Sequence, residues 1–456
     1  MDRFDVRGGN RLSGRLTIKG SKNAALPLMC ASLLTDESFV LRDIPELADI
    51  ANMQRLLPEL GVEVAYDRAS DPESPGGVLR MKVTDLTASH ARYDVVRTMR
   101  ASISVLGPLL ARRGYARVSL PGGCAIGERP VDIHLRGLAA LGADISLDGG
   151  DIIARVPRAP GGKPGRLVGA RVFLGGPFGS TVLGTANVMS AATLARGTTI
   201  IESAACEPEI VDLANLLNAM GAKITGQGSP RIIIEGVESL GAADHRVIPD
   251  RIEAGTFMCA AAITGGDITL DNCPVDALMA HMDRLQHMGV VMQYEASADP
   301  MRATCRIMFD SIAKVLQPIE VTTQPHPGFP TDLQAQLMAV LALADGNSVV
   351  TERIFTERFL HVAELSRMGA KLYRQGSTVV VSGVRHLVGA PVMASDLRAS
   401  ACLVLAGLAA KGTTVINRVY HLDRGYERME ERLRTLGAEI ERVNERESAT
   451  LAPGVA

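Results

Sequence analysis

The chain has 456 residues, of which 46% are hydrophobic, 45 are glycine and none is tryptophan. This length exceeds the usual size of a single hydrophobic core, so two domains are the default expectation. The net charge of -2 excludes an overall field that would attract nucleic acid or a membrane surface. Any site for an anion must therefore be a local cluster of cations.

The cysteines, the start of the chain and the apolar runs all favour a cytoplasmic protein. Seven cysteines without paired spacing fit reduced thiols better than a disulfide framework. The first residues, MDRFDVRGGNRLSG, are charged and interrupted by glycine, unlike a signal peptide. No apolar run approaches the roughly 20 residues that cross a bilayer. We therefore expect neither a membrane nor nucleic acid as a partner.

In chain order, the predicted elements fall into six similar repeats. A short signature recurs as LGVEV, LGADI, MGAKI, MGVVM, MGAKL and LGAEI. Its glycines are separated by 81, 79, 68, 80 and 68 residues, and they are Gly61, Gly142, Gly221, Gly289, Gly369 and Gly437. This regular spacing indicates an internal repeat of about 70 to 80 residues.

Each signature ends an amphipathic helix and leads into a strand. A second kind of helix, made of small residues, precedes each amphipathic helix. The small-residue helices run into β-branched strands, with a glycine between helix and strand in five of the six repeats. Few polar residues interrupt these helices, so we expect them to be buried on most sides. The sequence predicts an α/β fold of six βα repeats, three per domain, with helices inside and sheets outside. The join is expected near HRVIPDRIEAGT at 245–256, with a ligand cleft between the domains.

Polar side chains suited to anions stand near helix starts and repeat boundaries. They are Lys22, Asn23, Arg100, Arg358, Arg398 and Arg424. A helix N-terminus favours anions, and arginine binds phosphate and carboxylate bidentately. For any one of these residues a surface salt bridge or a helix cap is the simpler interpretation. Together they predict a site for a small ligand that carries both phosphate and carboxylate.

Two residues are candidates for acid and base chemistry. Asp332 lies where a proline-rich loop leads into the fifth inner helix, whose dipole favours an ionised carboxylate. The alternative is that Thr331 or Asp332 caps that helix. Cys124 lies among turn-forming glycines close to Arg129, which should lower the pKa of its thiol. The alternative there is an incidental thiol in a flexible loop.

The sequence offers no metal or cofactor motif. His134, His326 and His361 stand apart from any Cys or His at metal-ligand spacing, so we interpret them as polar contacts. Neither GxxxxGK[ST] nor GxGxxG follows a predicted strand. We expect no metal and no cofactor.

Eight stretches carry a resemblance to a known family. They are SKNAALP, VRTMRASI, SLPGGCAIGERPVDIH, EPEIVD, FPTDLQAQ, ERFLHVAELSRMGA, DLRASA and HLDRGYER. Through them nearly the whole chain resembles the UDP-N-acetylglucosamine 1-carboxyvinyltransferases, a family of enolpyruvyl transferases. The resemblance implies an inside-out α/β barrel in each of two domains. Residues 22–247 would form the N-terminal domain with the Cys124 loop, and residues 1–21 and 248–456 the C-terminal domain with Asp332 and the arginine cluster.

The resemblance also implies a reaction. The enolpyruvyl group of phosphoenolpyruvate would move to the 3′-hydroxyl of UDP-N-acetylglucosamine with release of phosphate, as the first committed step of peptidoglycan precursor synthesis. No metal or redox cofactor would be needed. Cys124 would be the general acid and Asp332 the base for the sugar hydroxyl, with Lys22 and Arg398 as further catalytic residues.

The same motifs imply the binding residues. Phosphate would be held by Lys22, Arg129 and Arg424 with support from Arg100, and the carboxylate by Arg398 with Arg358 nearby. The nucleotide sugar would contact Asn23, Arg100, Arg129, Pro130, Val131, Asp132, Ile133, Asp332 and Ile354. The diphosphate contacts stay open, because either Gly179, Ser180 and Thr181 or Gly184 and Thr185 can align with the family's turn. Cys206 stands where the family often has arginine.

Two other functions remain open. One is an enzyme of the 3-phosphoshikimate 1-carboxyvinyltransferase type, which shares the six repeats and the cations but lacks the PGGCAIG loop. The other is a catalytically inactive nucleotide-sugar sensor on the same scaffold, which would need no acid and base pair.

Overall fold

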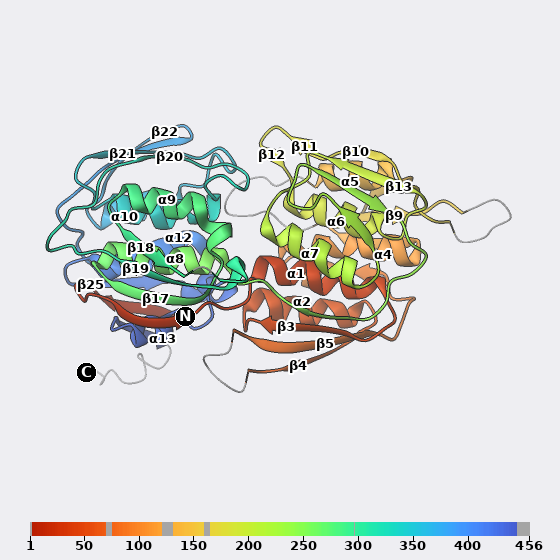
Figure 1. Ribbon diagram of the computed structural model, residues 1–456, viewed down its shortest axis with the longest axis horizontal. Helices are drawn as coiled ribbons and strands as arrows, with labels where there is room; N and C mark the ends of the chain where they lie inside the picture. Colours follow the sequence, from red (N-terminus) through yellow and green to blue (C-terminus); the bar gives the residue numbers. More distant parts are fainter. Residues whose placement is uncertain (1, 70–74, 121–130, 159–164, 296, 445–456) are drawn as a thin grey trace, which may run out of the picture. The chain divides into compact units, whose positions relative to one another are not determined.

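The structure is a computed structural model that describes residues 2–69, 75–120, 131–158, 165–295 and 297–444 (Figure 1). These residues form two compact units. Those up to Ile18 and from Pro249 onward make unit 1, and those from Lys19 to Ile248 make unit 2. Each unit has a hydrophobic core of its own. None of the helices in the described ranges combines the length and the apolar character needed to span a membrane.

Three four-stranded sheets cover the core of unit 2. In spatial order their strands are β16 (Ala243–Arg246), β3 (Phe39–Ile44), β5 (Gly77–Val83) and β4 (Val62–Asp67); β6 (His90–Ala91), β7 (Tyr115–Ser119), β9 (Asp151–Arg155) and β8 (Asp144–Asp148); and β10 (Arg171–Phe173), β13 (Thr198–Glu202), β15 (Arg231–Glu235) and β14 (Lys223–Thr225). A short hairpin of β11 (Gly175–Gly176) and β12 (Gly179–Ser180) is added.

Unit 1 repeats this arrangement. Its sheets are β2 (Ser13–Thr17), β17 (Asp267–Cys273), β19 (Ala303–Met308) and β18 (Val291–Tyr294); β20 (Glu320–Thr322), β21 (Asn347–Thr351), β23 (Thr378–Ser382) and β22 (Lys371–Gln375); and β24 (Pro391–Met393), β25 (Thr413–Asn417), β1 (Asp2–Arg7) and β26 (Glu439–Asn444). In all six sheets the first pair is parallel and the next two pairs are antiparallel. The six repeats predicted from the signature are therefore confirmed as six sheets of one topology.

The small-residue helices form the centre of each unit, as Figure 1 shows for α8, α10 and α12. They are α1 (Lys22–Ala31), α4 (Leu106–Arg113) and α6 (Val182–Ala192) in unit 2, and α8 (Arg251–Thr264), α10 (Gln334–Leu341) and α12 (Leu397–Ala409) in unit 1. Every residue of α10 is buried, and α12 packs against both α8 and α10. The equivalent strands β13, β21 and β25 share one alternation of buried and less buried residues, because only one face of each sheet lies on these helices.

The second helix of each repeat buries one face only. These helices are α2 (Ala48–Glu59), α5 (Asp132–Ala140), α7 (Pro208–Ala219), α9 (Met279–His287), α11 (Leu360–Arg367) and α13 (Met429–Thr435). A signature glycine follows each helix, and all six signature glycines have positive φ, between 76° and 102°. Glycine adopts this conformation without the strain that a Cβ would cause, which explains why the signature requires it.

Candidate active site

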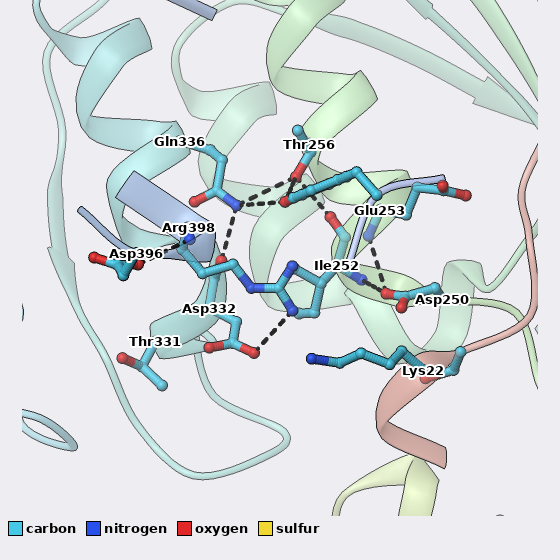
Figure 2. A network of polar contacts seen from close by, with 12 residues as sticks. Lys22, Asp250, Ile252, Glu253, Thr256, Thr331, Asp332, Gln336, Asp396 and Arg398 are labelled. Carbon is cyan, nitrogen blue, oxygen red and sulfur yellow. Dashed lines mark hydrogen bonds and ion pairs between the residues drawn. The ribbon is translucent and has the colours of Figure 1, made fainter. Parts of the chain in front are cut away.

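Asp332 is held between two buried arginines of unit 1. It lies in the 3-10 helix η6 (Thr331–Leu333), directly before α10. Arg358 Nη1 donates to Asp332 Oδ1 at 2.7 Å, and Arg398 Nη2 donates to Asp332 Oδ2 at 3.2 Å, the second bond being drawn in Figure 2. The arginine side chains are 7% and 4% exposed, whereas that of Asp332 is 26% exposed. Three predicted site residues from two repeats, the fifth and the sixth, thus meet within one unit.

The structure does not support the alternative that Thr331 or Asp332 caps the helix. Neither η6 nor α10 begins with a side-chain cap. The carboxylate instead makes two charge-assisted hydrogen bonds, which are stronger than neutral ones.

Arg398 is a buried cation, and one of its donor groups makes no hydrogen bond to the described residues. It lies in the first turn of α12, where Asp396 caps the helix by accepting from the backbone N–H groups of Arg398 and Ala399 at 2.9 and 3.1 Å. Its Nη1 is buried and has no hydrogen-bond partner among the described residues. Burial alone would lower the pKa of Arg398, but the negative charges of Asp332 and Asp250 raise that pKa above its ordinary value. Arg398 is therefore a permanent cation with a donor available to an anion.

An aromatic platform and two polar side chains support this cation. The guanidinium carbon of Arg398 lies 5.5 Å from the centre of the Tyr426 ring, a cation–π arrangement. The Tyr426 hydroxyl lies 2.8 Å from Thr256 Oγ1, and Gln336 Nε2 donates to that hydroxyl at 3.1 Å. Gln336 Nε2 also donates to the carbonyl of Asp332 at 2.9 Å (Figure 2). Burial raises the pKa of Tyr426, so its phenol stays neutral.

These three supporting residues are not among the site residues predicted from the sequence. Tyr426 and Gln336 stand inside two of the family stretches, HLDRGYER and FPTDLQAQ, and that neighbourhood is the signal that could have found them. Thr256 in α8 has no such signal, because its partners are brought to it only by the packing of α8, α10 and α12.

Lys22 is a buried, paired cation in unit 2. It is the first residue of α1, which Ser21 caps by accepting from the Ala24 N–H at 3.3 Å. Lys22 Nζ lies 3.0 Å from Asp49 Oδ2 in α2, and both side chains are largely buried. Asn23, next to it, is half-buried. Breaking a buried pair by removing one partner leaves an uncompensated charge, so the pair holds Lys22 firmly at the helix start.

His134 is a neutral polar contact, consistent with its interpretation from the sequence. Burial above all, with the positive charge of Arg100 in addition, lowers the pKa of His134 to about 4. Its Nδ1 lies 3.0 Å from Asn187 Nδ2, and this amide also donates to the Ile103 carbonyl at 3.0 Å. Since that nitrogen can only donate, His134 Nδ1 accepts and the ring proton is on Nε2. Among the described residues no group of three His, Cys, Asp or Glu side chains is arranged to hold a metal ion.

The remaining predicted site residues are dispersed over both units. In unit 2, Arg100 begins η2 (Arg100–Val105), Val131 precedes α5, and Asp132 and Ile133 lie in the first turn of α5. Gly179 and Ser180 form β12, Thr181 caps α6 by accepting from Gly184 N–H, and Thr185 lies within α6. In unit 1, Ile354 is half-buried after β21, and Arg424 ends η7 (Val419–Arg424). Cys124, Arg129 and Pro130 lie outside the described residues, so their roles stay predictions.

A family model described as EPSP synthase (3-phosphoshikimate 1-carboxyvinyltransferase) matches residues 6–433. The chain belongs to this family of enolpyruvyl transferases. It is 54% identical to the UDP-N-acetylglucosamine 1-carboxyvinyltransferase of Gluconacetobacter diazotrophicus, over 98% of this chain and 100% of that protein. It is 50% identical to the protein of the same name from Nitrobacter hamburgensis, again over 98% of this chain and 100% of that one.

Solved structures of enolpyruvyl transferases have the same fold. The enolpyruvyl transferase NikO from Streptomyces tendae superposes with a TM-score of 0.82 at 25% identity, covering 97% of this chain and 99% of that one. An EPSP synthase from Acinetobacter baumannii gives a TM-score of 0.73 at 18% identity, over 97% and 100% of the two chains. The predicted enolpyruvyl transferase fold is thereby confirmed.

Proposed function

We propose that this enolpyruvyl transferase moves the enolpyruvyl group of phosphoenolpyruvate to the 3′-hydroxyl of UDP-N-acetylglucosamine, as the first committed step of peptidoglycan precursor synthesis. The identity of 54% over the whole length of a protein of that activity supports this choice of substrates. The sugar oxygen bonds to C2 of phosphoenolpyruvate while C3 gains a proton; the C2–O bond to phosphate then breaks and C3 loses a proton. The products are enolpyruvyl-UDP-N-acetylglucosamine and phosphate.

The observation that carries the chemistry is the Asp332 carboxylate between Arg358 and Arg398. In the proposed mechanism the two arginines bind the carboxylate of phosphoenolpyruvate, and the free Nη1 of Arg398 supports this role. A carboxylate paired with two guanidinium groups is a weak base, because both charges favour its ionised form. When the substrate carboxylate takes over those donors, Asp332 becomes better able to accept the proton of the sugar hydroxyl.

The other roles follow the family resemblance. Lys22, Arg129 and Arg424 bind the phosphate in this proposal, with support from Arg100. Cys124 delivers the proton to C3. Asn23, Val131 and Ile354 are among the proposed contacts to the nucleotide sugar. No step of this scheme needs a metal or an organic cofactor.

The test is a phosphate-release assay with phosphoenolpyruvate and UDP-N-acetylglucosamine. Asp332→Asn keeps the shape of the side chain but cannot accept the proton, so kcat should fall by about 100-fold to 10,000-fold, the usual contribution of a general base. Binding of UDP-N-acetylglucosamine, measured by calorimetry, should remain. The matched control is Asp345→Asn, which changes an exposed carboxylate beyond the far end of α10 and should leave kcat within twofold of the wild type, a range of about 0.4 kcal/mol.

The acceptor separates the alternatives. Phosphate release with shikimate 3-phosphate but not with UDP-N-acetylglucosamine would establish the 3-phosphoshikimate activity instead. Binding of the nucleotide sugar without any phosphate release would identify a sensor. Equal turnover by the wild type and Asp332→Asn would refute the role of Asp332.

A further inference from the structure

Glu352 is a fully buried carboxylate that the proposed mechanism does not use. It directly follows β21 and has 0% exposure. A buried carboxylate is costly unless hydrogen bonds satisfy it, and Glu352 accepts four. Its Oε1 accepts from Thr323 Oγ1 at 2.7 Å and from the backbone N–H groups of Ile354 and Phe355 at 2.8 and 3.0 Å. Its Oε2 accepts from Thr331 Oγ1 at 2.9 Å.

The bond to Thr331 connects Glu352 with the arginine cluster. Arg358 Nη1 donates to Thr331 Oγ1 at 3.0 Å as well as to Asp332 Oδ1 at 2.7 Å. The Thr331 hydroxyl therefore accepts a hydrogen bond from Arg358 and donates one to Glu352. A second connection passes through Phe355, whose ring lies 5.7 Å from the guanidinium carbon of Arg358 and whose N–H is bound by Glu352.

We propose that Glu352 is a positioning residue for the carboxylate-binding arginines, which fixes the Thr331 hydroxyl and through it the guanidinium of Arg358 against Asp332. This inference rests on the proposed function, because it assigns Arg358 to the phosphoenolpyruvate carboxylate. Its physical basis is the direction of the hydrogen bonds. The acceptor Oε2 of Glu352 directs the Thr331 hydroxyl hydrogen away from Arg358, so a lone pair of the Thr331 oxygen faces the guanidinium.

Glu352→Gln reverses this direction at one place. Oε1 accepts from three donors, so in the variant the amide oxygen must stay there and the amide nitrogen must face Thr331. The Thr331 oxygen then meets two donors, and its own proton loses the Glu352 acceptor. Thr331→Val removes the same hydrogen bond from the other side.

The experiment measures kcat and KM for both substrates in Glu352→Gln, Thr331→Val and the double variant. Each single change should raise KM for phosphoenolpyruvate by roughly tenfold, the effect of losing one hydrogen bond to a charged group, with KM for UDP-N-acetylglucosamine changed much less. The double variant should be no worse than the worse single variant, because both changes remove one connection. Thr331→Ser, which keeps the hydroxyl, should restore the wild-type KM.

The matched control is Thr323→Val. It removes a buried hydroxyl that binds the same carboxylate but does not contact Arg358. It should lower the melting temperature and leave KM for phosphoenolpyruvate unchanged. An equal rise of KM in Thr323→Val, or effects that multiply in the double variant, would reduce Glu352 to a purely structural role.

A crystal structure of Thr331→Val gives a readout that does not depend on the substrates. Arg358 Nη1 should no longer lie at hydrogen-bond distance from Asp332 Oδ1. An unmoved Arg358 in this variant would overturn the positioning role, whichever acceptor substrate the enzyme uses. A displaced Arg358 in the variant, together with a wild type that is inactive with UDP-N-acetylglucosamine, would refute the proposed function alone.

Discussion

Arg398 and Asp332 show which properties of a site depend on tertiary structure. Their motifs marked both residues as candidates, because each stands at the start of a buried helix. That Asp332 pairs with two arginines could not be predicted, since the partners lie 26 and 66 positions away and meet only when three helices pack. Glu352 was missed for a similar reason: a single carboxylate after a strand has no motif, and two of its four donors, Thr323 and Thr331, lie 29 and 21 positions earlier in the chain.

Three buried histidines make the stability of the fold sensitive to acid. Burial is the main cause that lowers the pKa of His134, His281 and His361 from 6.5 to about 4. The unfolded chain therefore binds protons that the folded chain does not, so the free energy of unfolding falls as the pH drops from 6.5 towards 4. Each histidine should contribute a loss of about 2 kcal/mol between pH 7 and pH 5.

Urea unfolding at the two pH values measures this loss. In His281→Gln the difference in the free energy of unfolding between pH 7 and pH 5 should be smaller by about 2 kcal/mol, the contribution of one histidine. The control is His287→Gln, which makes the same substitution at an exposed side chain. A variant of His281 with the full wild-type loss would contradict the argument.

At the scale of elements, the repeat could be predicted because its signal is local. Each signature glycine has positive φ after a helix, and each small-residue helix is buried along most of its length. The sheet order was not predictable to the same degree, because β10 and β24 have only three residues each and a strand of that length has no clear period. Such strands form because the neighbouring strand supplies their hydrogen bonds.

Gly369 isolates the conformational role of the signature. Its φ is +89°, and a Cβ at this position would meet no atom within 4 Å. Gly369→Ala should therefore cost about 1–2 kcal/mol of stability through backbone strain alone, and Gly369→Asn should cost less because Asn tolerates this region better. Denaturant unfolding of both variants provides the measurement, and equal losses would show that strain is not the cause.

At the scale of the whole molecule, two strands from the start of the chain complete unit 1. β1 lies between β25 and β26, and β2 pairs with β17. Phe4 and Val6 of β1 are fully buried in the core of this unit. The sequence alone did not reveal this exchange, which came only from the family resemblance, because strand pairs so distant in sequence leave no local pattern.

Removal of residues 2–18 tests this arrangement. Unit 1 should unfold, since one sheet loses an interior strand and its core loses buried side chains, whereas unit 2 should stay folded around its own core. Hydrogen exchange followed by mass spectrometry should show lost protection in residues 249–444 and retained protection in the described residues of 19–248. Loss of protection in both ranges would contradict the independence of the two cores.

The pairing of β1 with β25 also sets an order of events on the ribosome. Arg3 faces Asn417 in that ladder, so β1 is translated more than 400 residues before its partner strand. At typical elongation rates this delay is about 20–80 s, during which unit 2 is already complete and can fold. Until then β1 stays unpaired and its two core residues, Phe4 and Val6, stay unburied, so a chaperone that shields this segment would protect it from aggregation.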